Sequence, residues 1–237
     1  MYRWDAEARP VWYNDPDAQP YTAEEKRDWA RRHEQQRREQ HDKHLRAEIK
    51  GQALIKTARA DRHNYFDYKG LPNAQGLVDI DGNLLVPMRH ILSNRLQGVQ
   101  VISWDGEAMV YHKKMIYGMR AADAVFRLGH KRASATILCE GYATGLSIEL
   151  AARLVRIQAS VVICFSAGNL ERVAKHCPRA LVFADHDGSG RGEQAARATG
   201  LRWCMSDKVG NDANDDHEQF GLMAVSKKIH QALHKMD

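Results

Sequence analysis

Three acidic residues stand where apolar, strand-like runs of the sequence end. Glu140 lies in the motif ILCEGYATG, and Asp185 and Asp187 lie in LVFADHDGSGRG. Each motif has the pattern of a strand, a tight turn and a helix, and in open parallel sheets the ligand site lies at the carboxyl ends of the strands. Carboxylate oxygens suit Mg²⁺. The three acids therefore predict a magnesium site at one edge of an α/β sheet.

Each acidic motif also has a purely structural interpretation. A glutamate at a helix N-terminus is favoured by the helix dipole, and a D-x-D turn can cap a helix. The GSGRG segment after Asp187 offers backbone N–H groups and Arg191 to a phosphate, although it lacks the lysine and serine or threonine of a P-loop. Downstream, Asp212 and Asp215 in GNDANDDHEQF are either turn residues or further metal ligands. The residues alone leave these alternatives open.

The elements that must position the acids form a predicted α/β unit over residues 134–237. The segment ASVVICFSAGNL reads as a further strand and turn of the same sheet, and ATGLSIELAARL has the pattern of an amphipathic helix. A final helix with a basic end is predicted from His217 to Met236. Acids from separate strands would then converge on one site.

A β-rich module is predicted over residues 61–133. Its short runs of alternating apolar and polar residues are divided by glycines, and hairpin turns are expected at Asp81-Gly82 and Asp105-Gly106. For any single basic residue of this module, a solubilising role is the simpler interpretation. As a set near an acidic metal site, the basic residues are candidates for phosphate contacts: Lys69, Arg89, Arg95, Lys113, Lys114 and Arg120.

Residues 1–60 are expected to form an irregular aromatic segment followed by a long charged helix. The segment contains Trp4, Trp12 and Tyr13, and the helix is predicted from Thr22, which forms a capping box with Glu25, to about Arg59. Nine basic and seven acidic residues are interleaved between positions 24 and 50. This pattern favours a solvated helix held by ion pairs, with nucleic-acid contact as the alternative.

The composition indicates a globular protein, and we expect it to remain in the cytoplasm. The chain has 237 residues, 43% of them hydrophobic and 27% charged, with neither a membrane-length apolar run nor the apolar core of a signal peptide. Its four scattered cysteines form no C-x-x-C pair, so no zinc is expected. The net charge of +5 permits a polyanionic partner without requiring one.

Taken in order, ILCEGYATGLSI, SAGNL, FADHDGSGRG and GNDANDDHEQFG resemble the Toprim domain of topoisomerases and primases. The resemblance is greatest to Toprim primase-like proteins of bacteriophages and conjugative plasmids, and it extends over about residues 60 to 225 because HNYFDYKGL, NLLVPMRH and the VQVISWDGEA hairpin resemble the module that precedes Toprim there. It implies a Rossmann-like parallel sheet flanked by helices, preceded by a small β-rich α+β module and the charged helix.

For the site, the resemblance implies Mg²⁺, with Mn²⁺ as an alternative, at Glu140, Asp185 and Asp187, with Asp212 and Asp215 completing the metal shell. Glu140 would act as general acid or base. The basic residues that would bind nucleotide or backbone phosphate are Lys69, Arg89, Lys113, Lys114, Arg120 and Arg191.

For function, the resemblance implies a primase or primase fragment of a bacterial host cell that joins ribonucleotides on single-stranded DNA. A replicative helicase or a separate zinc-binding protein is an expected partner, and a membrane is not. The alternatives are a Toprim nuclease that cleaves DNA or RNA, and a non-catalytic protein that binds nucleic acid or replication proteins.

Overall fold

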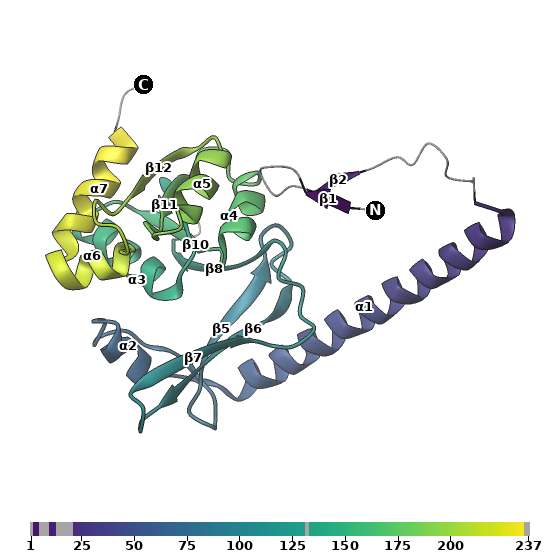
Figure 1. The fold of residues 1–237 in the computed structure, drawn as a ribbon. Coiled ribbons are helices and arrows are strands. Elements are labelled where there is room, and N and C mark those ends of the chain that lie inside the picture. Colours follow the sequence, from purple (N-terminus) through teal and green to yellow (C-terminus); the bar gives the residue numbers. More distant parts are fainter. Residues whose placement is uncertain (1, 5–9, 13–20, 131–132, 235–237) are drawn as a thin grey trace. The chain divides into compact units, whose positions relative to one another are not determined.

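The computed structural model describes residues 2–4, 10–12, 21–130 and 133–234, whose elements are drawn in Figure 1. The chain divides into two compact units, residues 1–42 and residues 43–237. The mixed α/β architecture, with a parallel sheet flanked by helices and a long N-terminal helix, confirms the predicted fold class. Among the described residues, no helix is long and apolar enough to cross a membrane.

The segment before the long helix contains regular structure, which corrects the expectation of an irregular one. Strand β1 (Tyr2–Trp4) pairs antiparallel with β2 (Pro10–Trp12). The side chains of Trp4 and Trp12 and the whole of Tyr13 lie outside the described residues.

Helix α1 (Ala23–Thr57) matches the predicted charged helix. Its N-terminus has the expected capping box, in which the backbone N–H of Thr22 donates to Glu25 and the backbone N–H of Glu25 donates to the Thr22 hydroxyl. Up to residue 42 the helix is almost wholly exposed. From residue 43 it packs on a sheet, where Ala47 joins a buried cluster with Leu85 and Val99. One helix thus has a solvated half and a packed half.

The β-rich module contains both predicted hairpins. Strands β4 and β5 turn through Asp81 and Gly82, and β6 and β7 turn after Asp105. The module's elements are β3 (Arg59–Asp61), α2 (Asn64–Tyr68), β4 (Gly76–Val78), β5 (Leu84–His90), β6 (Leu96–Asp105), β7 (Val110–Met115) and β8 (Ala124–Gly129). Strand β5 pairs with β8, and β8 pairs antiparallel with β10 of the α/β segment that follows. One sheet therefore extends through the β-rich module and the α/β segment.

The α/β unit alternates strands and helices as its sequence predicts. Strands β9, β10, β11 and β12 are parallel to their neighbours among them and lie in the order β12-β11-β9-β10. Its elements are β9 (Ala135–Cys139), α3 (Tyr142–Leu154), β10 (Ala159–Ile163), α4 (Ala167–Ala174), β11 (Leu181–Ala184), α5 (Arg191–Ala198), β12 (Arg202–Met205), α6 (Ala213–Phe220) and α7 (Leu222–His234).

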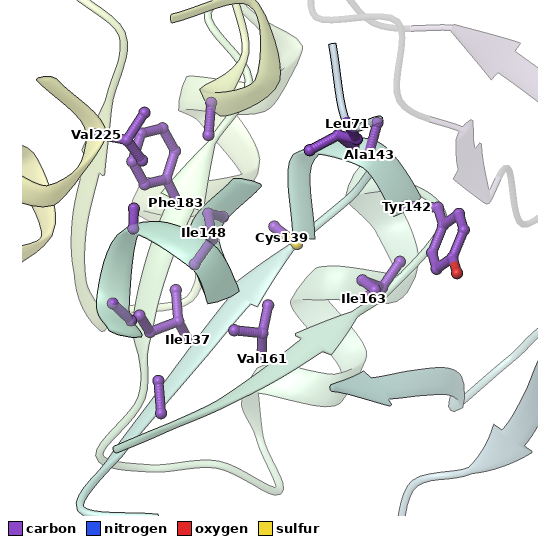
Figure 2. Close-up of a cluster of buried hydrophobic side chains, with 14 of the residues drawn as sticks. Leu71, Ile137, Cys139, Tyr142, Ala143, Ile148, Val161, Ile163, Phe183 and Val225 are labelled. Carbon is purple, nitrogen blue, oxygen red and sulfur yellow. The ribbon is translucent and has the colours of Figure 1, made fainter. Parts of the chain in front are cut away.

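Two apolar layers hold this sheet, one on each face. Figure 2 shows the first, in which Ile137, Val161 and Phe183 from three strands pack with Ile148 of α3 and Val225 of α7. The residues that alternate with them, including Leu138, Val162 and Val182, form the second layer with the helices of the opposite face. Because both faces are covered, the strands read as continuous apolar runs.

The C-terminal segment differs from the expected single helix. Gly221 interrupts it with φ of +79°, a conformation that side-chain-bearing residues rarely adopt, so α6 and α7 are separate helices. Helix α6 begins at Ala213, inside the segment that the sequence suggested as a loop. Strand β12 was not predicted.

Candidate metal and nucleic-acid site

The predicted acids lie at the carboxyl ends of parallel strands. Glu140 follows β9 and Asp185 follows the adjacent strand β11. At the end of β10, the backbone N–H of Phe165 donates to the Glu140 carbonyl (2.9 Å). The chain therefore turns away from the sheet at a common edge, as the strand pattern predicts.

Asp185 has a partly buried side chain at this edge. Burial, followed by the charges of Asp212, Glu140 and further carboxylates, raises the pKa of Asp185 to about 8. Its Oδ1 is buried and has no hydrogen-bond partner. A buried carboxylate oxygen without a donor, in the midst of other acids, is the arrangement that a bound cation would stabilise.

Asp187 lies two residues further on and is already hydrogen-bonded on both oxygens. Its Oδ1 accepts from the backbone N–H of Ser189 (2.8 Å) and of Arg191 (3.3 Å), and its Oδ2 accepts from the N–H of Gly192 (3.2 Å). These bonds, above all the one from the Ser189 hydroxyl, lower the pKa of Asp187. Asp187 thus caps the start of α5, and the amides offered to a phosphate by the GSGRG segment are used by this carboxylate.

Gly192 keeps this turn against the end of β11. A Cβ at residue 192 would lie 2.2 Å from the carbonyl oxygen of Asp185, a separation that no side chain can adopt without movement of the backbone. Only glycine allows α5 to start so close to the strand. The third glycine of GSGRG is therefore a packing requirement of the acidic edge.

Asp212 and Asp215 start helix α6 through a reciprocal capping box. Asp212 Oδ1 accepts from the N–H groups of Asn214 (2.6 Å) and Asp215 (3.0 Å), and Asp215 accepts from the N–H of Asp212 (3.0 Å). The other oxygen of Asp212 accepts from the hydroxyl of Thr144 in α3 (2.7 Å). Both aspartates are near enough to Asp185 to raise its pKa, so the structure gathers all the predicted acids in one region.

Glu140 is half-buried at the same edge. Burial, followed by the charge of Asp187, raises the pKa of Glu140, while the backbone N–H of Ala167 and the charge of Arg191 oppose the shift. Arg191 itself forms an ion pair with Glu171 (3.1 Å). Arg191 therefore lies among the acids, partly engaged by its own neighbours.

Two of the predicted cations, Lys69 and Lys113 of the β-rich module, interact electrostatically with the acids. Burial and the charge of Lys69 lower the pKa of Lys113, while Asp212 and Asp185 oppose that shift. Burial also disfavours charged Lys69, but Tyr111 and the nearby carboxylates of Asp212, Asp215 and Glu218 outweigh it and raise the pKa of Lys69. Both ammonium groups lie over the ring of Tyr111, at 5.9 and 5.2 Å from its centroid.

The other predicted cations are placed differently. Arg89 donates to the carbonyl of Asn94 (3.2 Å), and Lys114 follows Lys113 in β7, so its side chain points to the opposite face of the strand. Arg120 lies exposed between β7 and β8. Among the described residues, no contact joins these three side chains to the acids. Arg95, also singled out in the sequence, pairs with Glu48 of α1.

Several residues that build the site were missed in the sequence. Buried Asn214 donates to the carbonyl of Lys69 (2.9 Å) and to the Ser147 hydroxyl (3.2 Å), which ties the β-rich module to α3 and α6. Thr144 supports Asp212 in the same way. Asn214 is adjacent to Asp215, and Thr144 lies four residues after Glu140. Their hydrogen-bond partners are far apart in sequence, so no local pattern predicts these contacts.

The donor set suits a hydrated magnesium ion better than a closed protein cage. In the described parts of the chain, no three His, Cys, Asp or Glu side chains come together tightly enough to hold a metal by themselves. The free Oδ1 of Asp185, however, offers one hard ligand among acids. Mg²⁺ usually keeps several waters and binds through one or two carboxylates plus phosphates, and these residues fit that mode.

Comparison with known proteins gives a domain match over this part of the chain. A model of the Toprim domain matches residues 135–222, and Toprim domains generally bind Mg²⁺. No curated protein sequence matches the chain.

One similar solved structure is a DNA primase domain from Pseudomonas aeruginosa, with 14% identity, a TM-score of 0.44 and coverage of 77% of this chain and 58% of that one. The chain thus spans less than two thirds of the length of that structure. The domain match covers β9 to the start of α7, which includes every acid of the site, and residues 135–222 form a Toprim domain.

Proposed function

We propose that this protein is a primase of the phage and plasmid type, or a fragment of one, that uses Mg²⁺ to make short RNA primers on single-stranded DNA. The observation that carries the proposal is the free, buried Oδ1 of Asp185, set among acids and faced by Lys69 and Lys113 of the β-rich module. Nucleotidyl transfer needs both signs of charge, because anionic phosphates must approach a metal held by anions.

In the proposed reaction, the 3′-hydroxyl of one ribonucleotide attacks the α-phosphate of the next, a phosphodiester bond forms and pyrophosphate leaves. Bound Mg²⁺ would neutralise the phosphates and favour the alignment of the reacting oxygens. Asp185 would hold the ion, with Glu140, Asp187, Asp212 and Asp215 as further candidate ligands. Glu140 is the candidate to exchange the hydroxyl proton, and Lys69 and Lys113 are the candidates to bind phosphate.

The β-rich module favours synthesis over cleavage. Two lysines of the module, at the end of α2 and in β7, interact electrostatically with Asp212. Asn214 joins the α2 end of the module to the Toprim domain through its hydrogen bond to the Lys69 carbonyl. A nuclease needs a site for one phosphodiester, whereas a polymerising enzyme must also hold an incoming triphosphate. The additional cations supply a place for that group.

The test is a gel assay with circular single-stranded DNA, Mg²⁺ or Mn²⁺ and four ribonucleotides, one of them labelled. Wild type should give short labelled oligomers, and Asp185→Asn should give none. The matched control is Asp81→Asn, since Asp81 is an exposed aspartate in the β4–β5 turn. Nicked or degraded circles without labelled oligomers would replace the proposal with a nuclease, and no turnover with either metal would favour a binding protein.

A readout independent of activity is the effect of Mg²⁺ on stability. A ligand that binds only the folded protein raises its melting temperature. Wild type and Asp81→Asn should both be stabilised by millimolar Mg²⁺, whereas Asp185→Asn should not respond. An equal rise in the melting temperature of all three proteins would show that Asp185 is not needed for Mg²⁺ binding.

A further inference from the structure

Three aromatic side chains of the β-rich module form one continuous cluster. The ring of Tyr68 lies 5.7 Å from that of Trp104 and 5.3 Å from that of Tyr111. Tyr68 ends α2, whereas Trp104 and Tyr111 are directly paired residues of β6 and β7. We call these three residues the aromatic platform.

The platform is a partly exposed extension of the core. Ile102 and Lys113 form the next pair but one along the hairpin, so they share a face with Trp104 and Tyr111. Ile102 is fully buried in the main cluster together with Tyr65, while Tyr68 is 50% exposed and Trp104 is partly exposed. On strand β6, this face therefore changes from the buried Ile102 to the partly exposed Trp104 toward the turn of the hairpin.

Two cations lie at one end of the platform. The Lys69 and Lys113 ammonium groups lie over Tyr111, at one end of the platform, and both interact electrostatically with Asp212. Neither lysine forms a close ion pair with a carboxylate in the parts of the chain that the structure describes. Aromatic rings followed by unpaired cations match the bases and phosphates of a single strand, since any base can stack on a ring.

We propose that the aromatic platform binds single-stranded nucleic acid by stacking, without sequence preference, and guides the strand past Lys113 and Lys69 to the acids. The direction of the strand rests on the proposed function, whereas the binding itself does not. An ordinary core cluster would bury all three rings, whereas Tyr68 is half exposed and Trp104 and Tyr111 are partly exposed.

The test measures the affinity of labelled oligo-dT and of a mixed-sequence strand by fluorescence anisotropy, without metal or nucleotides. Tyr68→Ala and Trp104→Ala should each weaken binding of both strands by about 5- to 100-fold, because base stacking on an aromatic side chain contributes that much. Trp104→Phe should keep most of the affinity. Lys113→Gln should reduce the slope of log affinity against log salt by about 0.7.

Tyr117→Ala is the matched control, since Tyr117 is an 86% exposed tyrosine of the same module that lies next to Gly118, which packs against Lys43 of α1. It should bind like wild type. Unchanged affinity in folded Tyr68→Ala and Trp104→Ala would overturn the proposal and would favour a protein as the ligand of the platform. Because the assay contains no metal or nucleotide, loss of primer synthesis with intact platform binding would count against the proposed function alone.

Discussion

The turn after β11 and the turn before α6 are both rich in aspartate, yet they use their carboxylates differently. In the second turn, Asp212 and Asp215 accept backbone N–H groups at the start of a helix. In the first, Asp187 does the same for α5, while Asp185 has one oxygen that is buried and accepts from no donor. The carboxylate without a structural role is the one best placed for chemistry.

This difference separates stability from activity within a single motif. A capping aspartate stabilises the folded chain, so its removal costs free energy of unfolding. An unpartnered, buried carboxylate destabilises the metal-free protein, so its removal costs none. The substitutions below test that separation, from the largest expected effect to the smallest.

Asp185→Asn should have the largest effect on activity. Loss of the proposed metal-binding charge should lower the rate of primer synthesis by about 100-fold or more, because preorganised electrostatic groups contribute at that scale. The metal-free variant should be at least as stable as wild type to urea. Asp187→Asn should instead be less stable than wild type to urea, since its loop loses charge-assisted hydrogen bonds. A destabilised Asp185→Asn would contradict the comparison.

Gly192→Ala should have the largest effect on stability. The new Cβ would overlap the carbonyl of Asp185, and overpacking of this kind costs about 1–3 kcal/mol. Gly188→Ala is the control in the same turn, because nothing lies within 4 Å of the position that its Cβ would take and the φ of Gly188 is not positive. That control should stay within about 0.5 kcal/mol of wild type in urea unfolding. Equal stability of the two variants would show that the turn can move.

Much of the framework follows from local sequence pattern. The capping box at Thr22, the hairpin turn at Asp81-Gly82 and the strands that precede Glu140 and Asp185 all depend on neighbouring residues, and all were predicted. The break at Gly221 was missed, because a glycine within an otherwise helical pattern does not by itself reveal its φ.

The use of each carboxylate could not be predicted, because it depends on residues distant in sequence. Thr144 and Asp212, which share a hydrogen bond, are 68 positions apart, and Asn214 reaches Lys69 across 145 positions. The aromatic platform likewise joins α2 to a hairpin that follows it. The local sequence pattern predicts the acidic edge, whereas long-range packing determines which carboxylate oxygens at this edge have no hydrogen-bond donor.

Asp212→Ala should destabilise the protein by about 1–2 kcal/mol. It removes the N-cap of α6, which typically contributes about 1 kcal/mol, and leaves the buried Thr144 hydroxyl without its acceptor. Asp215→Ala removes only the return bond of the capping box, so its effect in urea unfolding should be smaller. A larger effect of Asp215→Ala would mean that the α6 start depends on more than its cap.

Thr144→Val should have the smallest effect, about 0.5–1.5 kcal/mol, because it removes a single buried hydrogen bond and nearly preserves side-chain volume. Combined with Asp212→Ala it should add little further loss, since both changes break the same bond. Full additivity in the double variant would show that the two residues stabilise the protein independently. Because Asp212 keeps its two backbone donors in Thr144→Val, primer synthesis should fall less than in Asp212→Ala, and the capping aspartate would then act mainly by holding α6 beside Asp185.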